Sequence, residues 1–317
     1  MNPTLRPNAL GLKSMLGTEF LTEDQIWKVL HTALYFKKIQ DLGQSPPLTL
    51  AGKTVILLFF EPSTRTRSSF ELAAKRLGAN TLILYKEGSS AEKGETLVDT
   101  ARNIEAMRPD ALVLRHPSAG SPYHLDQILS IPVLNAGDGF HEHPSQALLD
   151  LMTIYEFKKT LRGLKILIVG DIAHSRVARS DIYALRTMGA EVSVCGPPTL
   201  LPPRTEQMGV KVFYHLEEAV KEQDVVMLLR IQFERLGVSQ IPSRGEYAKF
   251  YGMSNKLLSL CRPDVTIMHP GPVNRGVELA PEVADGPRSV ILNQVGNGVL
   301  VRMALLHLLT GGEVLKP

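Results

Sequence analysis

The chain has little cysteine, no long apolar run and little excess charge of either sign. Among its 317 residues, Cys195 and Cys261 are the two cysteines, and they lie far apart without C-x-x-C or zinc-ligand spacing. We therefore expect reduced structural thiols, with a disulfide between them as the alternative. No apolar run approaches the roughly 20 residues that cross a bilayer, and the N-terminus lacks a signal-peptide pattern. A cytoplasmic location is predicted.

The net charge of +3, from 35 basic and 32 acidic residues, is too small to indicate a nucleic-acid partner. No basic tract or series of aromatic-spaced strands accompanies it. Hydrophobic residues make up 44% and charged residues 21%, which is typical of a folded globular protein. The length predicts about two domains of roughly 150 residues each.

Apolar runs of strand length alternate with helical patterns along most of the chain. A capping box formed by Thr22 and Gln25 marks the start of the first helix. Alternating strands and helices predict parallel α/β sheets, in which ligands gather at the carboxyl ends of the strands. The predicted strands comprise residues 54–60, 81–85, 111–115, 165–169, 192–195, 225–229 and 265–268, with a further short strand and tight turn within 133–139.

The most specific stretch is E-P-S-T-R-T-R-S-S-F-E, residues 61–71. It joins the strand at 54–60 to a helix whose apolar stripe begins at Phe70. At the helix start, free backbone N–H groups and the helix dipole favour an anion. The alternative is an ordinary Ser/Thr cap beside solvated arginines. The residues placed in this turn are Ser63, Thr64, Arg65 and Thr66.

Other polar residues follow later strands of the first half. Arg115 ends a strand and requires an anionic partner, which could instead be an acid such as Asp138. His143 and Gln146 lie three residues apart at a helix start, so they share a face and can address one small ligand. The alternative for His143 is a surface position. The polar segment 86–95 is, by composition, a solvated loop.

A second βαβ pattern begins at residue 165 and raises the alternative of a nicotinamide-dependent oxidoreductase. A dinucleotide site needs G-x-G-x-x-G so that the backbone can approach a pyrophosphate. The turn G-D-I-A-H-S-R, residues 170–176, supplies only Gly170 of these glycines. The sequence therefore disfavours dinucleotide binding.

Two of these motifs resemble those of the aspartate and ornithine transcarbamoylases. They are F-E-P-S-T-R-T-R-S-S-F-E and H-P-S-Q-A-L-L-D, residues 60–71 and 143–150. The resemblance implies a homotrimer with shared active sites, in which Ser89 and Lys93 reach a neighbouring subunit's site. It implies catalytic roles for Arg65, Thr66, Arg115 and His143. The implied carbamoyl-phosphate site comprises Ser63, Thr64, Arg65, Thr66, Ser89, Lys93, Arg115, His143 and Gln146.

Later motifs favour an amino-acid substrate with two carboxylates. R-I-Q-F-E-R, residues 230–235, resembles the R-x-Q-x-E-R pattern of the aspartate-specific members. H-P-G-P, residues 269–272, stands where ornithine-specific members have H-C-L-P. Many relatives have leucine in place of Gly271 and an arginine directly after the motif, whereas here Arg275 is set back. The implied aspartate site comprises Lys93, Arg176, Arg230, Gln232, Pro270 and Gly271.

The resemblance implies an α/β fold of two similar-sized domains, each a parallel sheet flanked by helices. Residues 1–150 plus 294–317 would bind carbamoyl phosphate and residues 151–293 would bind aspartate. The implied reaction is carbamoyl transfer to L-aspartate, early in pyrimidine biosynthesis, without a metal or cofactor. A regulatory chain or a dihydroorotase is a possible partner. The alternatives are a transferase for another amino acid and a catalytically silent scaffold.

Overall fold

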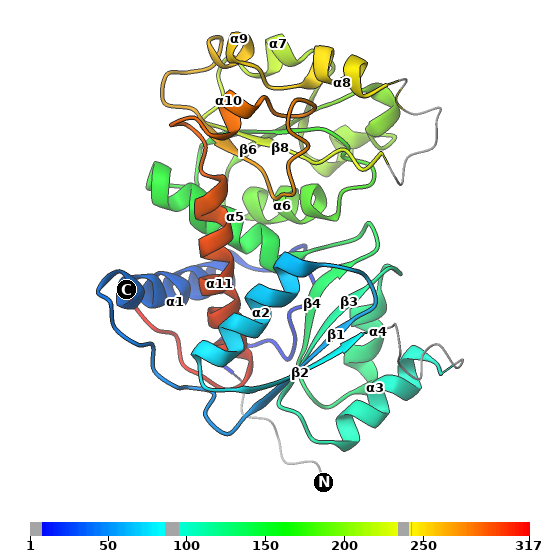
Figure 1. Ribbon diagram of the computed structural model, residues 1–317, viewed down its shortest axis with the longest axis vertical. Coiled ribbons are helices and arrows are strands. Elements are labelled where there is room, and N and C mark those ends of the chain that lie inside the picture. The colour runs from blue at the N-terminus through cyan, green and yellow to red at the C-terminus, as the bar shows by residue number, and fades with distance from the viewer. Residues whose placement is uncertain (1–7, 86–94, 234–240, 242) are drawn as a thin grey trace. The chain divides into compact units, whose positions relative to one another are not determined.

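The computed structural model describes residues 8–85, 95–233, 241 and 243–317 of the chain, which divides into two compact units (Figure 1). Unit 1 comprises Met1–Met152 and Gly296–Pro317, and unit 2 comprises Thr153–Val295. The chain passes from one unit to the other within two helices, α5 (Pro144–Lys158) and α11 (Ile291–Leu309). Each unit contains one parallel sheet with helices packed on it, so the predicted α/β class is confirmed.

The sheet of unit 1 has four parallel strands in the order β2-β1-β3-β4. In the register, Phe59 at the end of β1 pairs with Tyr85 of β2 and Arg115 of β3. The carboxyl ends of neighbouring strands therefore lie along one edge of the sheet. The strands are β1 (Thr54–Phe59), β2 (Asn80–Tyr85), β3 (Ala111–His116) and β4 (Val133–Asp138).

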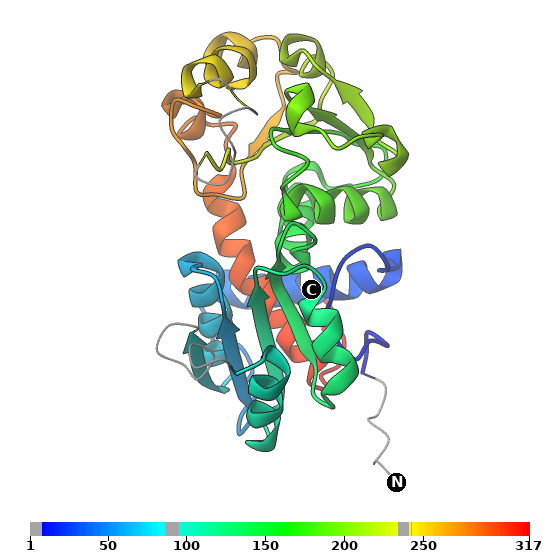
Figure 2. The ribbon, with the colours of Figure 1, turned by 90° about the vertical axis from the view of Figure 1, so that its right-hand side faces the viewer.

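Helices cover both faces of this sheet (Figures 1 and 2). On one face, α3 (Leu97–Ala106) and α4 (Ser121–Ile128) pack in a buried apolar cluster against β1, β3 and β4. On the other lies α2 (Thr64–Arg76). Helix α1 (Glu23–Asp41) begins with the predicted capping box, in which the Gln25 backbone N–H donates to Thr22 Oγ1 at 3.2 Å.

The sheet of unit 2 has five parallel strands in the order β7-β6-β5-β8-β9. Helix α6 (Arg176–Thr187) covers one face, and the short helices α7 to α10 gather on the other (Figure 1). The strands are β5 (Lys165–Val169), β6 (Glu191–Cys195), β7 (Lys211–Phe213), β8 (Val225–Leu228) and β9 (Thr266–Met268). The short helices are α7 (Leu216–Ala219), α8 (Arg244–Tyr251), α9 (Asn255–Leu258) and α10 (Pro281–Ala284).

The core beneath these short helices contains both cysteines as free thiols, so the prediction of reduced structural thiols is confirmed. Burial raises the pKa of Cys195 to about 12 and that of Cys261 to about 11. Thiolate formation at neutral pH is therefore strongly disfavoured. Among the described residues, no helix combines the length and apolar character needed to cross a membrane.

Candidate functional site

The turn after β1 presents an open helix start. Ser63 is the N-cap of α2, yet its side chain makes no capping hydrogen bond to the described part of the helix, and the first turn contains no acidic residue. The first N–H groups of the helix and its dipole thus favour an anion at this point. Thr66 is buried, whereas Arg65 is exposed at the surface of unit 1. Arg67 bonds to the Tyr85 hydroxyl and stacks on its ring.

Arg115 lies at the carboxyl end of β3, next to this turn. Its Nη1 donates to the Ala136 carbonyl at 3.0 Å, and its Nε lies 3.4 Å from Glu61 Oε2. Both side chains of this ion pair are about one-tenth exposed, at 12% and 11%. The alternative of an ion pair with a nearby acid is thus confirmed, but the acid is Glu61, at the start of the 61–71 motif, and not the suggested Asp138. The carboxylate of Asp138 instead accepts from Gly120 N and Asn135 Nδ2.

His143 and Gln146 lie where β4 gives way to α5. The Gln146 backbone N–H donates to the His143 carbonyl at 2.9 Å, so the two residues occupy the first turn of the helix, as predicted. Both are buried, at 4% and 9% exposure. The side-chain nitrogen of Gln146 donates to the carboxylate of Asp150, one turn further along α5. This contact fixes one end of the Gln146 carboxamide.

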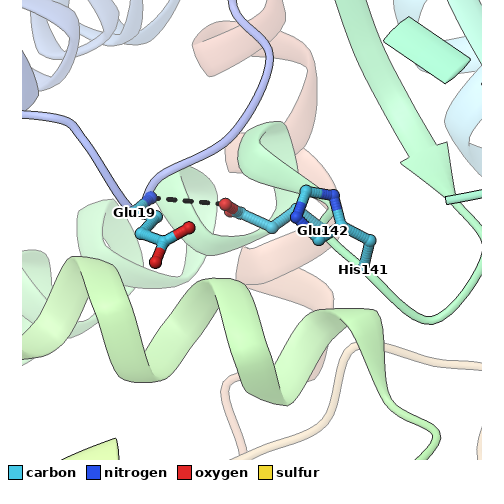
Figure 3. A group of neighbouring side chains, drawn as sticks. All are labelled: Glu19, His141 and Glu142. Carbon is cyan, nitrogen blue, oxygen red and sulfur yellow. Dashed lines mark hydrogen bonds between the residues drawn. The ribbon is translucent and has the colours of Figure 1, made fainter. Parts of the chain in front are cut away.

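The residue before His143 anchors an N-terminal segment (Figure 3). Glu142 is fully buried and accepts hydrogen bonds from the backbone and hydroxyl of Thr18 and from the backbone of Glu19. A β-carbon at Gly17 would lie 2.2 Å from Glu142 Oε1, so this approach requires glycine. Glu142, Glu19 and His141 could each offer one atom to a metal ion. Because N–H and O–H donors already occupy the Glu142 carboxylate, we interpret it as a structural anchor.

In unit 2, Arg176 is the first residue of α6, directly after the turn that follows β5. It is buried at 8% exposure, and the hydroxyl of Ser175 caps the helix by accepting from Ala178 N at 3.1 Å. Within the turn, Asp171 accepts from the His174 backbone. Burial raises the pKa of Asp171 in spite of this contact. The turn is therefore closed by side-chain contacts.

Arg230 and Gln232 follow β8, the strand next to β5, and both are half-buried. Arg176 and Arg230 thus stand at the carboxyl ends of adjacent parallel strands in unit 2. The remainder of the R-I-Q-F-E-R motif, Glu234 and Arg235, lies outside the described residues, as do Ser89 and Lys93.

The segment after β9 is held by a buried pair. His269 Nδ1 accepts from the Gly271 backbone at 2.8 Å, and its Nε2 lies 3.2 Å from Glu278 Oε1. Glu278 also accepts from Asn274 N at 2.6 Å. An imidazole that accepts at Nδ1 has its proton on Nε2 and donates it to Glu278. Pro270 and Gly271 are held at the start of this segment, where Gly271 has a positive φ of 69°.

Arg275, which stands back from the H-P-G-P motif, pairs with a different acid. Its guanidinium forms two hydrogen bonds to Asp285, at 2.6 and 2.7 Å, and both side chains are more than half exposed. The displaced arginine is therefore part of a surface ion pair, and we assign it no substrate contact.

The structure shows four charged residues that the sequence did not reveal as partners. Glu61 pairs with Arg115, Asp150 accepts from Gln146, Glu278 pairs with His269, and Arg302 interacts electrostatically with Asp150. The spacing of Asp150 from Gln146 was a usable signal, because residues four apart share a helix face. Arg302 was visible as the one Lys or Arg in α11, within the apolar stretch that follows Gly298. No comparable spacing rule links Glu278 to His269.

Within each unit, the predicted side chains follow neighbouring strands at the same sheet edge. In unit 1 they follow β1, β3 and β4, and in unit 2 they follow β5, β8 and β9. Unit 1 combines a helix start with an arginine, a histidine and an amide. Unit 2 combines two arginines with a constrained backbone segment. These are groups that can bind a phosphate, a carbonyl and carboxylates.

Comparison with known proteins finds two family models along the chain. The model of the aspartate/ornithine carbamoyltransferase carbamoyl-P binding domain matches residues 13–156, and that of the Asp/Orn binding domain matches residues 162–309. The aspartate carbamoyltransferase catalytic subunit of Syntrophotalea carbinolica is 53% identical, covering 97% of this chain and 98% of its own. The catalytic subunit of Desulfotalea psychrophila is 56% identical, with 95% of each chain covered.

Solved structures show the same fold. An aspartate transcarbamoylase from Trypanosoma cruzi, in complex with carbamoyl phosphate and aspartate, has a TM-score of 0.86 and 30% identity, covering 97% of this chain and 99% of its own. An ornithine carbamoyltransferase from Pyrococcus furiosus has a TM-score of 0.84 and 32% identity, covering 94% and 97%. Both domain models and these near-full-length matches show that the chain belongs to the aspartate/ornithine carbamoyltransferase family.

Proposed function

We propose that the chain transfers the carbamoyl group of carbamoyl phosphate to L-aspartate, giving N-carbamoyl-L-aspartate and phosphate early in pyrimidine biosynthesis. The observation that carries this choice of amino acid is the arginine pair, Arg176 after β5 and Arg230 after the adjacent β8. Each guanidinium fork can bind one carboxylate in two places. The second cation repels the terminal ammonium of ornithine. Relatives of 53% and 56% identity that bear the aspartate name support the same choice.

In this proposal, carbamoyl phosphate binds at the start of α2. Ser63, Thr64 and Thr66 supply hydroxyl and backbone donors to the phosphate, and Arg65 stabilises the charge on the departing oxygen. The lack of a capping hydrogen bond from the Ser63 side chain and of first-turn acids among the described residues supports this role. Gln146 contacts the amide of the carbamoyl group.

The reaction proceeds by direct attack of the uncharged aspartate amine on the carbonyl carbon. A C–N bond forms, the carbonyl oxygen takes up negative charge, and the C–O bond to phosphate then breaks with both electrons leaving on the phosphate. The amine proton passes to the departing phosphate or to solvent. Thr66, Arg115 and His143 donate to the carbonyl oxygen, and one good donor of this kind contributes about 3 kcal/mol.

The amino acid is held by unit 2. Arg176 binds the α-carboxylate, Arg230 and Gln232 bind the side-chain carboxylate, and the carbonyls of Pro270 and Gly271 accept from the amino group. The buried His269–Glu278 pair supports this role, because it fixes the segment that carries these carbonyls. Much of the remaining acceleration comes from orientation of the two reactants.

The active unit in this proposal is a homotrimer, and Ser89 and Lys93 complete the site of a neighbouring subunit. Mixing Lys93→Ala chains with Arg65→Ala chains tests it, because some sites in mixed trimers then contain neither substitution. We expect partial recovery of activity in the mixture. No recovery in verified mixed trimers would count against shared sites. Association with a regulatory chain or a dihydroorotase is tested by co-purification with each.

The function itself is tested by ureido-product formation from carbamoyl phosphate, with L-aspartate and L-ornithine side by side. We expect turnover with aspartate alone. Turnover with ornithine alone would mean that the R-I-Q-F-E-R motif had been misread. No ureido product with either amino acid, in verified trimers, would favour a catalytically silent scaffold.

A further inference from the structure

A buried charge cluster lies behind the Gln146 side chain in unit 1. It consists of Gln146, Asp150 and Arg302, which are 9%, 0% and 4% exposed, and we term it the amide clamp. Burying a carboxylate and a guanidinium has a large desolvation cost, and an apolar pair of similar volume is often as stable. Stability alone therefore does not account for the burial of this cluster.

The contact between Gln146 and Asp150 has a fixed polarity. Gln146 Nε2 lies 3.1 Å from one carboxylate oxygen of Asp150 and 3.2 Å from the other. An ionised carboxylate can only accept hydrogen bonds, so the amide nitrogen must face it. Turning the amide over would place oxygen against oxygen. The Gln146 Oε1 atom is consequently held at the end of the group directed away from Asp150.

Arg302 supplies the opposite charge for Asp150. Its Nη1 donates to the Gly298 carbonyl at 3.0 Å, and its Cζ lies 5.1 Å from the ring centroid of Phe70 on α2. Burial lowers the pKa of Arg302 to about 10, and the charge of Asp150 opposes this shift. Arg302 therefore stays protonated at neutral pH and places its positive charge near the Asp150 carboxylate.

The absence of a side chain at Gly298 leaves room for the Arg302 guanidinium. A β-carbon at position 298 would lie 2.6 Å from Arg302 Nη1 and 3.2 Å from Leu149 Cδ2. The glycine of the G-N-G sequence in α11 thus has a packing reason linked directly to the clamp.

We propose that Asp150 and Arg302 are positioning residues that turn the oxygen of Gln146 toward the ligand, and so select an acyl phosphate with an N–H donor over one with a methyl group. The inference rests on the proposed function, in which Gln146 contacts the carbamoyl amide. A methyl group at the same place leaves the amide oxygen without a donor. A site built around a hydrogen bond rejects an analogue that lacks it.

The test compares carbamoyl phosphate with acetyl phosphate, which replaces NH₂ by CH₃, and uses inorganic phosphate as a reference. Dissociation constants of all three are measured for the full-length wild type and Asp150→Asn. We expect the preference for carbamoyl over acetyl phosphate to fall by about 10-fold to 100-fold in the variant, with phosphate affinity changed less than about twofold. Asparagine preserves volume but can donate as well as accept, so it no longer fixes the amide.

Asp110→Asn is the matched control, because Asp110 is a half-buried carboxylate at the opposite end of the sheet, where it accepts from Thr54 N at 2.8 Å. It should leave the preference unchanged. An unchanged preference in folded Asp150→Asn would overturn the proposal. So would an equal loss for all three ligands, because that indicates a purely structural role. Failure of the wild type to bind carbamoyl phosphate would instead contradict the proposed function.

Two further variants keep the test decisive if Asp150→Asn fails to fold. Gly298→Ala displaces Arg302 and should reduce the preference partly, again without loss of phosphate affinity. Gln146→Ala should abolish the preference. Adding Gly298→Ala to it should not change further the ratio of the dissociation constants of acetyl and carbamoyl phosphate. Additive effects on the ratio would show that the clamp acts independently of Gln146, and would refute the inference.

Discussion

The two units differ in how buried charged side chains hold the residues of their candidate sites. In unit 1, Gln146 and Asp150 lie one turn apart on α5, and Arg302 lies one turn from Gly298 on α11. In unit 2, His269 and Glu278 close an irregular segment between β9 and α10. Helix periodicity places Asp150 beside Gln146, although Arg302 comes from a distant helix, whereas the unit 2 pair joins residues nine apart in an irregular segment. We expect unit 2's segment to be the more sensitive to loss of a single side chain.

The largest expected effect tests the division into chemistry in unit 1 and amino-acid binding in unit 2. Arg65→Ala should lower kcat by about 10²-fold to 10³-fold, because it removes a donor to the departing oxygen. The KM for aspartate should change less than about threefold. Arg65 is exposed, so the variant should fold normally, and its thermal unfolding provides the control. Near-normal turnover would refute the role assigned to Arg65.

The reciprocal substitution in unit 2 is Arg230→Ala. Loss of a charged hydrogen-bonding pair should raise the KM for aspartate by about 10-fold to 100-fold, while carbamoyl-phosphate affinity stays the same. Steady-state kinetics with each substrate varied separately measure both effects. Arg275→Ala is the matched control, since this arginine pairs with Asp285 at the surface. A purely kcat effect of Arg230→Ala would contradict its assignment to binding.

Glu278→Ala tests whether the His269–Glu278 pair holds the irregular segment of unit 2, in contrast to the amide clamp, whose residues lie on helices. The substitution leaves the Asn274 N–H and the His269 Nε2–H without their acceptor and should reduce the free energy of unfolding by about 3 kcal/mol. Chemical denaturation measures this loss. Glu282→Ala, an exposed acid of the adjoining helix α10, is the control and should change stability by less than about 0.5 kcal/mol. Equal stability of the two variants would show that the pair does not hold the segment.

The smallest effect concerns a buried histidine of α11 in unit 1. Burial lowers the pKa of His307 below its ordinary 6.5, although its bond to the Glu313 carbonyl opposes this shift. A lowered folded-state pKa gives stability that is present above the unfolded pKa and lost as pH falls through the folded pKa. His307→Gln should therefore flatten the decrease in Tm below about pH 6.5. His215→Gln, an exposed control, should keep the wild-type slope; identical slopes for all three proteins would contradict the prediction.

Local sequence rules predicted the regular elements well. The Thr22–Gln25 capping box forms, and apolar runs become the parallel strands. The short elements β7, α4 and α7 to α10 were not predicted. They span between three and eight residues, too few for a helical or strand period to appear clearly. Their packing on the sheets stabilises them where intrinsic propensity is insufficient.

For the candidate site, the sequence identified residues that follow strand ends, because that position is a property of chain order in a parallel sheet. It did not identify the partners of those residues. Asp138 was the example given for the alternative of an acid paired with Arg115, but strand register brings Glu61 to it instead. The three-residue spacing of His143 and Gln146 was sufficient to place both in one helical turn.

By itself, the sequence determined the α/β class, the polar helix start at residues 63–66 and the family, because each depends on short-range pattern or contiguous motif. Tertiary structure alone decided which charges are buried together. Arg302 and Asp150 are far apart in the chain, and their interaction exists because α11 returns to unit 1 beside α5 and α2 (Figure 2). The cost of burying a charge depends on its three-dimensional surroundings, which no local spacing specifies.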